Sequence, residues 1–137
     1  MTYKPIRYRL YPNDAQRDML MRHFGSTRWV YNRYISQADR LYFELGQYIK
    51  RDEFIVDLAR LKKTEFPWLS EVNSQSLQMA ARNAATAYER FFKGLAKHPK
   101  FKSKHSKQSF QCPQHVRVLF SESSSQYGRI VLPKIGS

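Results

Sequence analysis

The side chains best suited to chemistry in this sequence are cations gathered between positions 90 and 110. This stretch contains seven Lys or Arg residues, two histidines and no carboxylate. Flexible cations spaced along a chain neutralise phosphates, and this neutralisation supplies much of the affinity for a nucleic-acid backbone. We therefore predict nucleic-acid contacts, above all from the last four of the following residues: Lys93, Lys97, Lys100, Lys102, Lys104 and Lys107.

Two further polar groups could extend this surface. Near the N-terminus, tyrosines that can stack on bases alternate with three cations, Lys4, Arg7 and Arg9. A second group opens a predicted helix, whose N-terminus attracts phosphate, and consists of Ser74, Gln75, Gln78 and Arg82. For this second group, simple helix capping with a solvated glutamine face is an equally good interpretation.

The sequence does not indicate a catalytic or metal-binding constellation. The four histidines lack the spacing and carboxylate companions of metal ligands, and His23 falls on an apolar helix face, which favours a place in the core. Cys112 and His115 lack a third group to orient them as a dyad, so a buried thiol is the better interpretation. Scattered carboxylates and single glycines indicate neither a two-metal nuclease centre nor a phosphate loop. We predict no catalytic residue, no metal site and no cofactor.

Composition favours a nucleic-acid partner. The 137 residues carry 24 Lys+Arg against 11 Asp+Glu, a formal charge of +13, which a polyanion would compensate. Residues 1–89 hold 14 basic and 10 acidic side chains, whereas residues 90–137 hold 10 basic and one acidic. A membrane-surface binder is the weaker alternative, because no helix combines a clustered basic face with an apolar one. With no signal peptide or apolar span and a single cysteine, we predict a cytoplasmic, nucleoid-associated protein without a membrane partner.

Helical periodicity dominates the first two thirds of the chain. Asn13 and Gln16 form a potential capping box for a first helix, and Gly25 predicts a break before a second helix that ends at Gly46. This pair is compatible with a helix-turn-helix motif or with an ordinary helical hairpin. A third helix is predicted over 51–65. A fourth, over 74–96, is predicted to turn Phe91, Phe92 and Leu95 inward.

Short β-prone runs flank the helices. Residues 3–11 alternate as in a half-buried strand, with Ile6, Tyr8 and Leu10 on one face. Further strands are predicted over 109–112, 116–120 and 129–132, with a polar turn at 121–128. The predicted fold class is therefore α+β, in which a bundle of about four helices is inserted between a first strand and returning strands.

Six spaced motifs resemble the N-terminal part of the TnpB (OrfB) family of transposon-encoded, RNA-guided DNA endonucleases. In chain order they are RLYPNDAQ (9–16), FGSTRWVYN (24–32), FPWLSEVNSQSLQMA (66–80), AYERFFKG (87–94), KFKSKHSKQSF (100–110) and LPKIG (132–136). The resemblance covers nearly the whole chain. It implies a first strand of a wedge domain (1–12), a helical recognition lobe (13–97), and a basic connector with returning wedge strands (98–137), the strands forming a small, incomplete antiparallel β-barrel.

The resemblance also implies function. Family members hold a guide RNA and its target DNA, and base pairing reads the target sequence. In relatives, the start of the helix matching 74–96 approaches the flanking DNA motif, and Gln78 keeps a matching type there. Three metal-binding acids and a four-cysteine zinc ribbon follow in the family, so we expect a truncated member that is not an enzyme by itself. Its further partner would be the missing nuclease part or another protein chain. The alternatives are a helix-turn-helix repressor and a nuclease subunit that needs a missing catalytic part.

Overall fold

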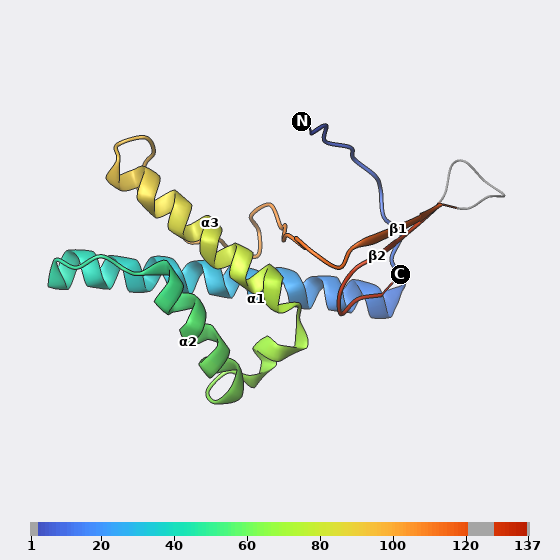
Figure 1. Cartoon of the computed structure of the whole chain (residues 1–137), viewed down its shortest axis with the longest axis horizontal. Helices are drawn as coiled ribbons and strands as arrows, with labels where there is room; N and C mark the ends of the chain where they lie inside the picture. The colour runs from blue at the N-terminus through green and yellow to red at the C-terminus, as the bar shows by residue number, and fades with distance from the viewer. Residues whose placement is uncertain (1–2, 121–127, 137) are drawn as a thin grey trace.

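Three α-helices and one β-hairpin make up the fold in the computed structural model, which describes residues 3–120 and 128–136. The helices are α1 (Asp14–Asp39), α2 (Arg51–Lys63) and α3 (Ser74–Phe92), and the strands are β1 (Arg117–Phe120) and β2 (Gly128–Val131). A π-helical turn, Arg40–Glu44, continues α1, and a 3₁₀ turn, Pro67–Glu71, precedes α3. In Figure 1, α1 is a long rod that α3 crosses, and the hairpin stands at the end of the view where α1 begins. None of the helices described is long and apolar enough to cross a membrane.

The start of α1 confirms the predicted capping box. The Asn13 side chain accepts a hydrogen bond from the Gln16 backbone N–H at 2.8 Å, and the Gln16 side chain accepts one from the Asn13 N–H at 2.9 Å. Two of the backbone donors that a helix start leaves unpaired are thereby satisfied. The sequence therefore fixes this helix start locally.

The predicted break at Gly25 is wrong, because α1 runs through it without interruption. The hydroxyl of Thr27 does not cap a new helix but donates to the His23 carbonyl oxygen, one turn back, at 2.8 Å. A glycine inside a helix costs only about 1 kcal/mol relative to alanine. Burial of Val30 and Tyr34 on the same helix outweighs that cost, since each apolar side chain of this size contributes about 1.5–3 kcal/mol.

The hydrophobic core lies where the three helices meet. Small residues of α3 let it approach α1 closely, and Leu69 of the 3₁₀ turn closes the core. The buried apolar residues are Val30, Tyr34, Ile35, Ala38, Phe54, Leu58, Leu61, Leu69, Val72, Leu77, Ala80, Ala81, Ala84 and Tyr88. The predicted helices over 51–65 and 74–96 are confirmed, each two to four residues shorter at its C-terminal end.

The predicted β-barrel and the four-helix bundle are both wrong. Residues 3–13 are extended but belong to no strand, and their alternating apolar side chains, Ile6, Tyr8 and Leu10, are exposed. Residues 109–112 form no strand either. Alternation alone cannot make a strand, because its backbone groups need a neighbouring strand to pair with. The fold remains mixed α and β, with three α-helices because the Gly25 break does not occur.

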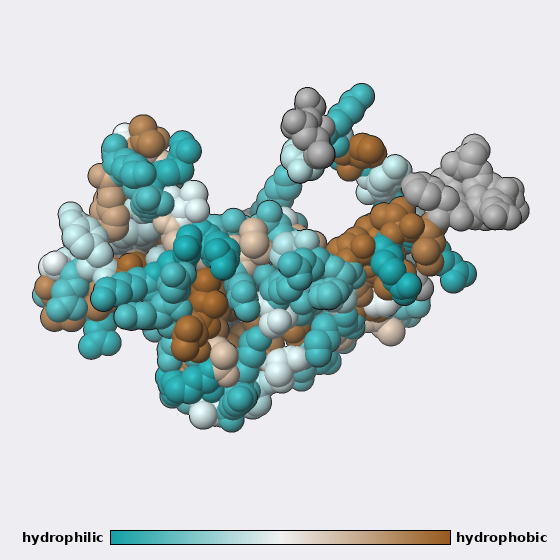
Figure 2. All heavy atoms as spheres, viewed as in Figure 1, coloured by the Kyte–Doolittle hydropathy of each residue, from teal (hydrophilic) through white to brown (hydrophobic). Residues whose placement is uncertain are grey.

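The only sheet among the described residues is the antiparallel hairpin of β1 and β2. Its register pairs Arg117 with Val131 and Phe120 with Gly128. Hydrophobic side chains remain exposed on it, as the brown band over the hairpin in Figure 2 shows. The predicted polar turn at 121–128 lies outside the described residues except for Gly128.

Candidate nucleic-acid interface

A cleft of about 260 Å³ opens between α1, α3 and the connector, the name used here for residues 98–111. Three cations line it, Arg28, Lys102 and Lys107, and no carboxylate does. None of the three forms an ion pair with a carboxylate of the described residues. Apart from Ala80, its other walls are aromatic and polar: Phe24, Tyr31, Phe110, Thr27, Ser76, Asn83, Ser103, Gln108, Ser109 and Gln111. We call it the basic cleft.

Asn32 of α1 holds the middle of the connector in place. Its side-chain amide donates to the Lys102 carbonyl oxygen at 2.8 Å, and its carbonyl oxygen accepts from the Lys102 backbone N–H at 2.7 Å. The Lys102 ammonium group then lies over the Tyr31 ring, 4.2 Å from its centroid. A cation above an aromatic face is attracted by the ring quadrupole. The two contacts together fix both the backbone and the charge of Lys102 at the cleft.

The start of the connector is tied to the end of α1. Nε2 of His98 lies 2.6 Å from the Asp39 carboxylate, whose same oxygen accepts a hydrogen bond from the Tyr88 hydroxyl at 2.5 Å. Burial, and then the hydrogen bond to Asp39, raise the pKa of Tyr88 well above its usual value, so the hydroxyl stays a donor. The ring of His98 also packs edge-on against Phe91 at 5.2 Å.

The end of the connector is bound to α3. The Ser76 hydroxyl donates to the Gln111 carbonyl oxygen at 2.7 Å, and the Asn83 side chain donates to the Gln111 side-chain oxygen at 2.8 Å. Just beyond the connector, Gln75 donates to the Gln114 side chain at 2.9 Å. The start of α3 therefore positions the connector, and the Gln75 amide group is engaged within the protein.

His23 links α1 to the start of α3 and confirms the prediction of a core histidine. It is fully buried, its Nδ1 lies 2.8 Å from the Met19 carbonyl oxygen, and its Nε2 accepts from the Asn73 backbone N–H at 3.1 Å. An accepting Nε2 means that Nδ1 carries the single proton. Burial lowers the pKa of His23, which favours this neutral form. Phe110 of the connector packs on the same ring at 4.9 Å.

The predicted binding residues fall into four places. Lys102 and Lys107 meet at the basic cleft, and Lys100 and Lys104 are exposed beside them on the connector. On α3, Ser74 and Arg82 are exposed, and Gln78 is half-buried. Exposed cations of the extended N-terminal segment are Lys4, Arg7 and Arg9. At the far end of α3, Lys93 pairs with Glu89 at 3.3 Å, and Lys97 is exposed just beyond the turn that follows.

Sequence reasoning missed the part of the cleft that α1 contributes. Arg28 and Tyr31 lie three residues apart, on one side of the helix, beside the buried Val30. Helical spacing places them on one face, but only the packing of the connector on α1 brings Lys102 to that face. The signal available in the sequence was a cation and an aromatic at helical spacing on a partly exposed face.

The metal sites that the family resemblance implies follow the segment that resembles this chain, so the resemblance places none among these residues. Across residues 3–120 and 128–136, no three His, Cys, Asp or Glu side chains gather as a metal-binding group. The sequence contains one cysteine, whereas the implied zinc ribbon needs four.

Comparison with known proteins gives the family. A family model of OrfB proteins of the IS605 type, described as a helix-turn-helix domain, matches residues 1–47. Over 124 residues the chain is 34% identical to a Streptomyces pristinaespiralis protein that carries the name RNA-guided DNA endonuclease. It is 30% identical over 132 residues to InsQ of Escherichia coli K12, which carries the same name. The chain belongs to the TnpB/OrfB family.

This TnpB-like chain spans about a third of the length of those two relatives. The aligned regions cover 90% and 96% of the chain but 30% and 32% of the relatives. A third relative, the virulence protein VsdF of Salmonella dublin, is 30% identical over 108 residues, which cover 72% of the chain and 91% of VsdF. The family resemblance predicted from the six motifs is thereby confirmed.

The family's helix-turn-helix domain takes an unexpected form here. Of the residues that match it, 14–39 form the single helix α1, and the π-helical turn follows directly. The turn required by the repressor alternative, at Gly25, is not formed.

Proposed function

We propose that this chain binds nucleic acid through the basic cleft and the connector, as the N-terminal part of a TnpB-like transposon protein. The observation that carries the proposal is the cleft itself, where Arg28, Lys102 and Lys107 converge without a carboxylate. Unpaired cations along a groove neutralise phosphates, and adjacent hydroxyl and amide groups can hydrogen-bond phosphate, sugar or base edges.

The finer partners follow from the family. The names of two relatives support a guide RNA and a target DNA as the bound molecules. We assign the helices of 13–97 to a recognition lobe and 98–137 to the segment carrying the connector, with the protein acting at the nucleoid. Strand cleavage is assigned to the part of the relatives that this chain does not span. A nicking assay with guide RNA and Mg²⁺ or Mn²⁺ tests this assignment, and any cutting by the purified chain would refute it.

Binding by charge-matched variants tests the proposed site. Replacing Lys102 and Lys107 together by glutamine should weaken binding of a labelled DNA duplex or RNA hairpin about tenfold or more at low salt. The matched control replaces Arg60 and Lys63 of α2 by glutamine, which removes the same charge from another helix. Equal losses from the two double variants would mean that binding depends on net charge alone and not on the cleft.

A further inference from the structure

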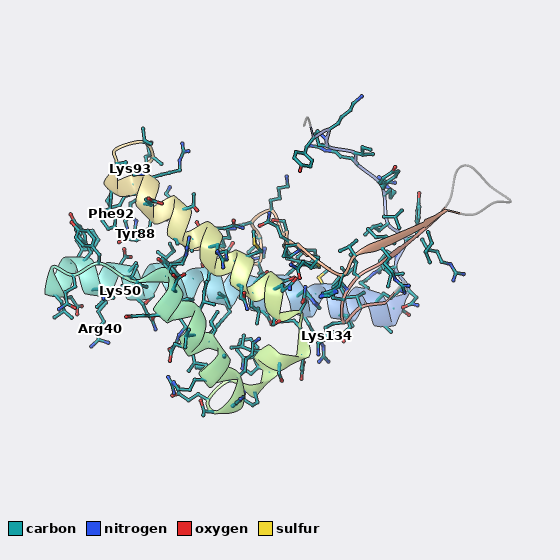
Figure 3. The ribbon with its side chains drawn as sticks, viewed as in Figure 1. Arg40, Lys50, Tyr88, Phe92, Lys93 and Lys134 are labelled. Atoms are coloured by element: carbon teal, nitrogen blue, oxygen red, sulfur yellow. The ribbon has the colours of Figure 1, made fainter. Side chains whose placement is uncertain are left out.

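A second surface lies at the opposite end of the helices from the hairpin. Here the π-helical turn ends α1, and Gly94, with a φ of +72°, turns the chain out of α3. Four aromatic side chains from these two ends and the loop after the π-helical turn contact one another: Tyr42, Phe43, Tyr48 and Phe92. Together with Leu45 and Leu95, which are exposed on the same two segments, we call them the end patch. In Figure 3, the labelled Phe92 and Lys93 lie at this end with Lys50 and Arg40, far from Lys134.

The aromatic rings of the end patch form a connected network. The ring of Tyr42 lies 4.9 Å from Phe92 and 5.0 Å from Phe43, between centroids. Tyr48 meets Phe92 edge-on at 5.2 Å. Aromatic pairs at these separations and tilts attract one another. The rings therefore hold each other in position without a covering segment among the described residues.

Much of this apolar area faces solvent. Phe43 is 63% exposed, Tyr48 67% and Leu95 64%. The prediction that Leu95 faces inward is thus wrong, because the Gly94 turn carries it past the end of α3. Figure 2 shows hydrophobic atoms at this end of the molecule among hydrophilic ones. A contiguous exposed apolar group, unlike a single exposed side chain, indicates a binding surface.

Cations and carboxylates both lie beside the end patch. Arg40, Lys50 and Lys93 each contact one exposed glutamate nearby in sequence, at 3.7, 3.9 and 3.3 Å respectively. Exposed ion pairs of this kind contribute little energy and are screened by salt, so each cation can also contact a phosphate. Lys97, two residues after Leu95, forms no ion pair within the described part of the chain.

We propose that the end patch stacks unpaired bases of a single-stranded nucleic acid, whose phosphates the neighbouring cations contact. Exposed rings next to cations provide both contacts that such strands need, because every base has a face to stack and every nucleotide carries a phosphate. Duplexes hide their base faces, so the end patch should discriminate in favour of single strands. The proposal rests on the proposed function to the extent that the chain binds nucleic acid, but it concerns a separate surface.

The test uses the whole chain with fluorescein-labelled DNA and RNA strands of about 12 nucleotides, an abasic strand of the same length and a duplex. Phe43→Ala with Tyr48→Ala should weaken single-strand binding about tenfold or more. Affinity for the abasic strand and for the duplex should change less than about twofold. Tyr48→Trp should retain binding, and Val56→Ala, an exposed apolar change on α2, is the matched control. Comparing the affinities for the DNA strand and the RNA strand shows which of the two the end patch prefers.

Each outcome has one meaning. A loss confined to strands with bases supports the proposal. The proposal is overturned if the double variant loses as much affinity for the abasic strand and the duplex as for strands with bases, or loses no affinity at all. It is also overturned if the double variant abolishes self-association of the chain while its affinity for single strands is unchanged. Failure of the proposed function would give different results. The unmodified chain would then bind neither duplex nor RNA hairpin, or the Lys102→Gln, Lys107→Gln variant would bind as well as its Arg60→Gln, Lys63→Gln control. Thermal melting followed by circular dichroism checks that the end-patch double variant and the cleft double variant remain folded.

Discussion

Single side chains position the basic cleft, and His23 does so from within the core. Its ring accepts from the backbone of Asn73, at the start of α3, and packs against Phe110 of the connector. Only the neutral ring can accept that hydrogen bond. Protonation therefore disconnects α1 from the helix start that binds the connector.

His23 should make the folded state sensitive to acid. Burial lowers its folded pKa below the ordinary value of about 6.5, so the unfolded chain binds a proton more readily. This contribution to stability is complete above about pH 6.5 and is lost as the pH falls toward the folded pKa. His23→Asn should reduce the free energy of unfolding by about 1–3 kcal/mol near neutral pH and make that free energy depend less on pH below about 6.5. Urea unfolding measures both; His105→Asn, an exposed control, should change neither.

If wild type and His23→Asn lose stability in parallel on acidification, His23 is not the titrating group.

The side chain of Asn32 gives a second testable prediction. Asn32→Ala removes both hydrogen bonds to the backbone of Lys102, at about 0.5–1.5 kcal/mol each. The connector should then open more often, and trypsin should cleave after its lysines several times faster, with nucleic-acid affinity reduced. Ser36→Ala, on an exposed face of the same helix, is the control. An unchanged rate of cleavage would show that the two Asn32 hydrogen bonds do not hold the connector in place.

At the scale of elements, α1 is continuous through Gly25, within the residues 1–47 that match the helix-turn-helix family model. One unbroken helix carries the capping box, Arg28, Asn32 and Asp39, so the two ties to the connector lie on one rigid element. A turn at Gly25 would separate the cleft residues from the helix start.

Gly25→Ala tests this continuity. An added Cβ would meet nothing closer than the Arg28 guanidinium at 3.9 Å, an ordinary contact. The helix should therefore become more stable by about 0.5–1 kcal/mol in thermal or urea unfolding. Gly46→Ala is the contrasting variant, because Gly46 has a φ of +63° and alanine there should cost about 1–2 kcal/mol. Destabilisation by both variants would instead indicate a turn at Gly25.

Over the whole molecule, sequence reasoning succeeded where the signal is local. Helical periodicity predicted α2 and α3, and Asn13 with Gln16 predicted the start of α1. It failed where contacts between residues distant in the sequence determine the structure. Burial around Val30 overrides the glycine at 25, and the alternation of residues 3–11 meets no partner strand.

The candidate site divides in the same way. Local charge density predicted Lys102 and Lys107, whereas Arg28 and Tyr31 join them only through the packing of the connector on α1. Leu95 is exposed because the chain turns at Gly94. The predicted helix extended past this glycine, and helical periodicity alone does not indicate that turn.

The salt dependence of nucleic-acid binding tests the central claim most directly. If about five cations, those of the basic cleft with Lys100 and Lys104, contact duplex phosphates, log affinity should fall against log salt with a slope near −4 to −5. Lys102→Gln with Lys107→Gln should reduce that slope to about −3, while Arg60→Gln with Lys63→Gln leaves it unchanged. An affinity that does not depend on salt, or a cleft variant with the slope of the wild type, would contradict the account.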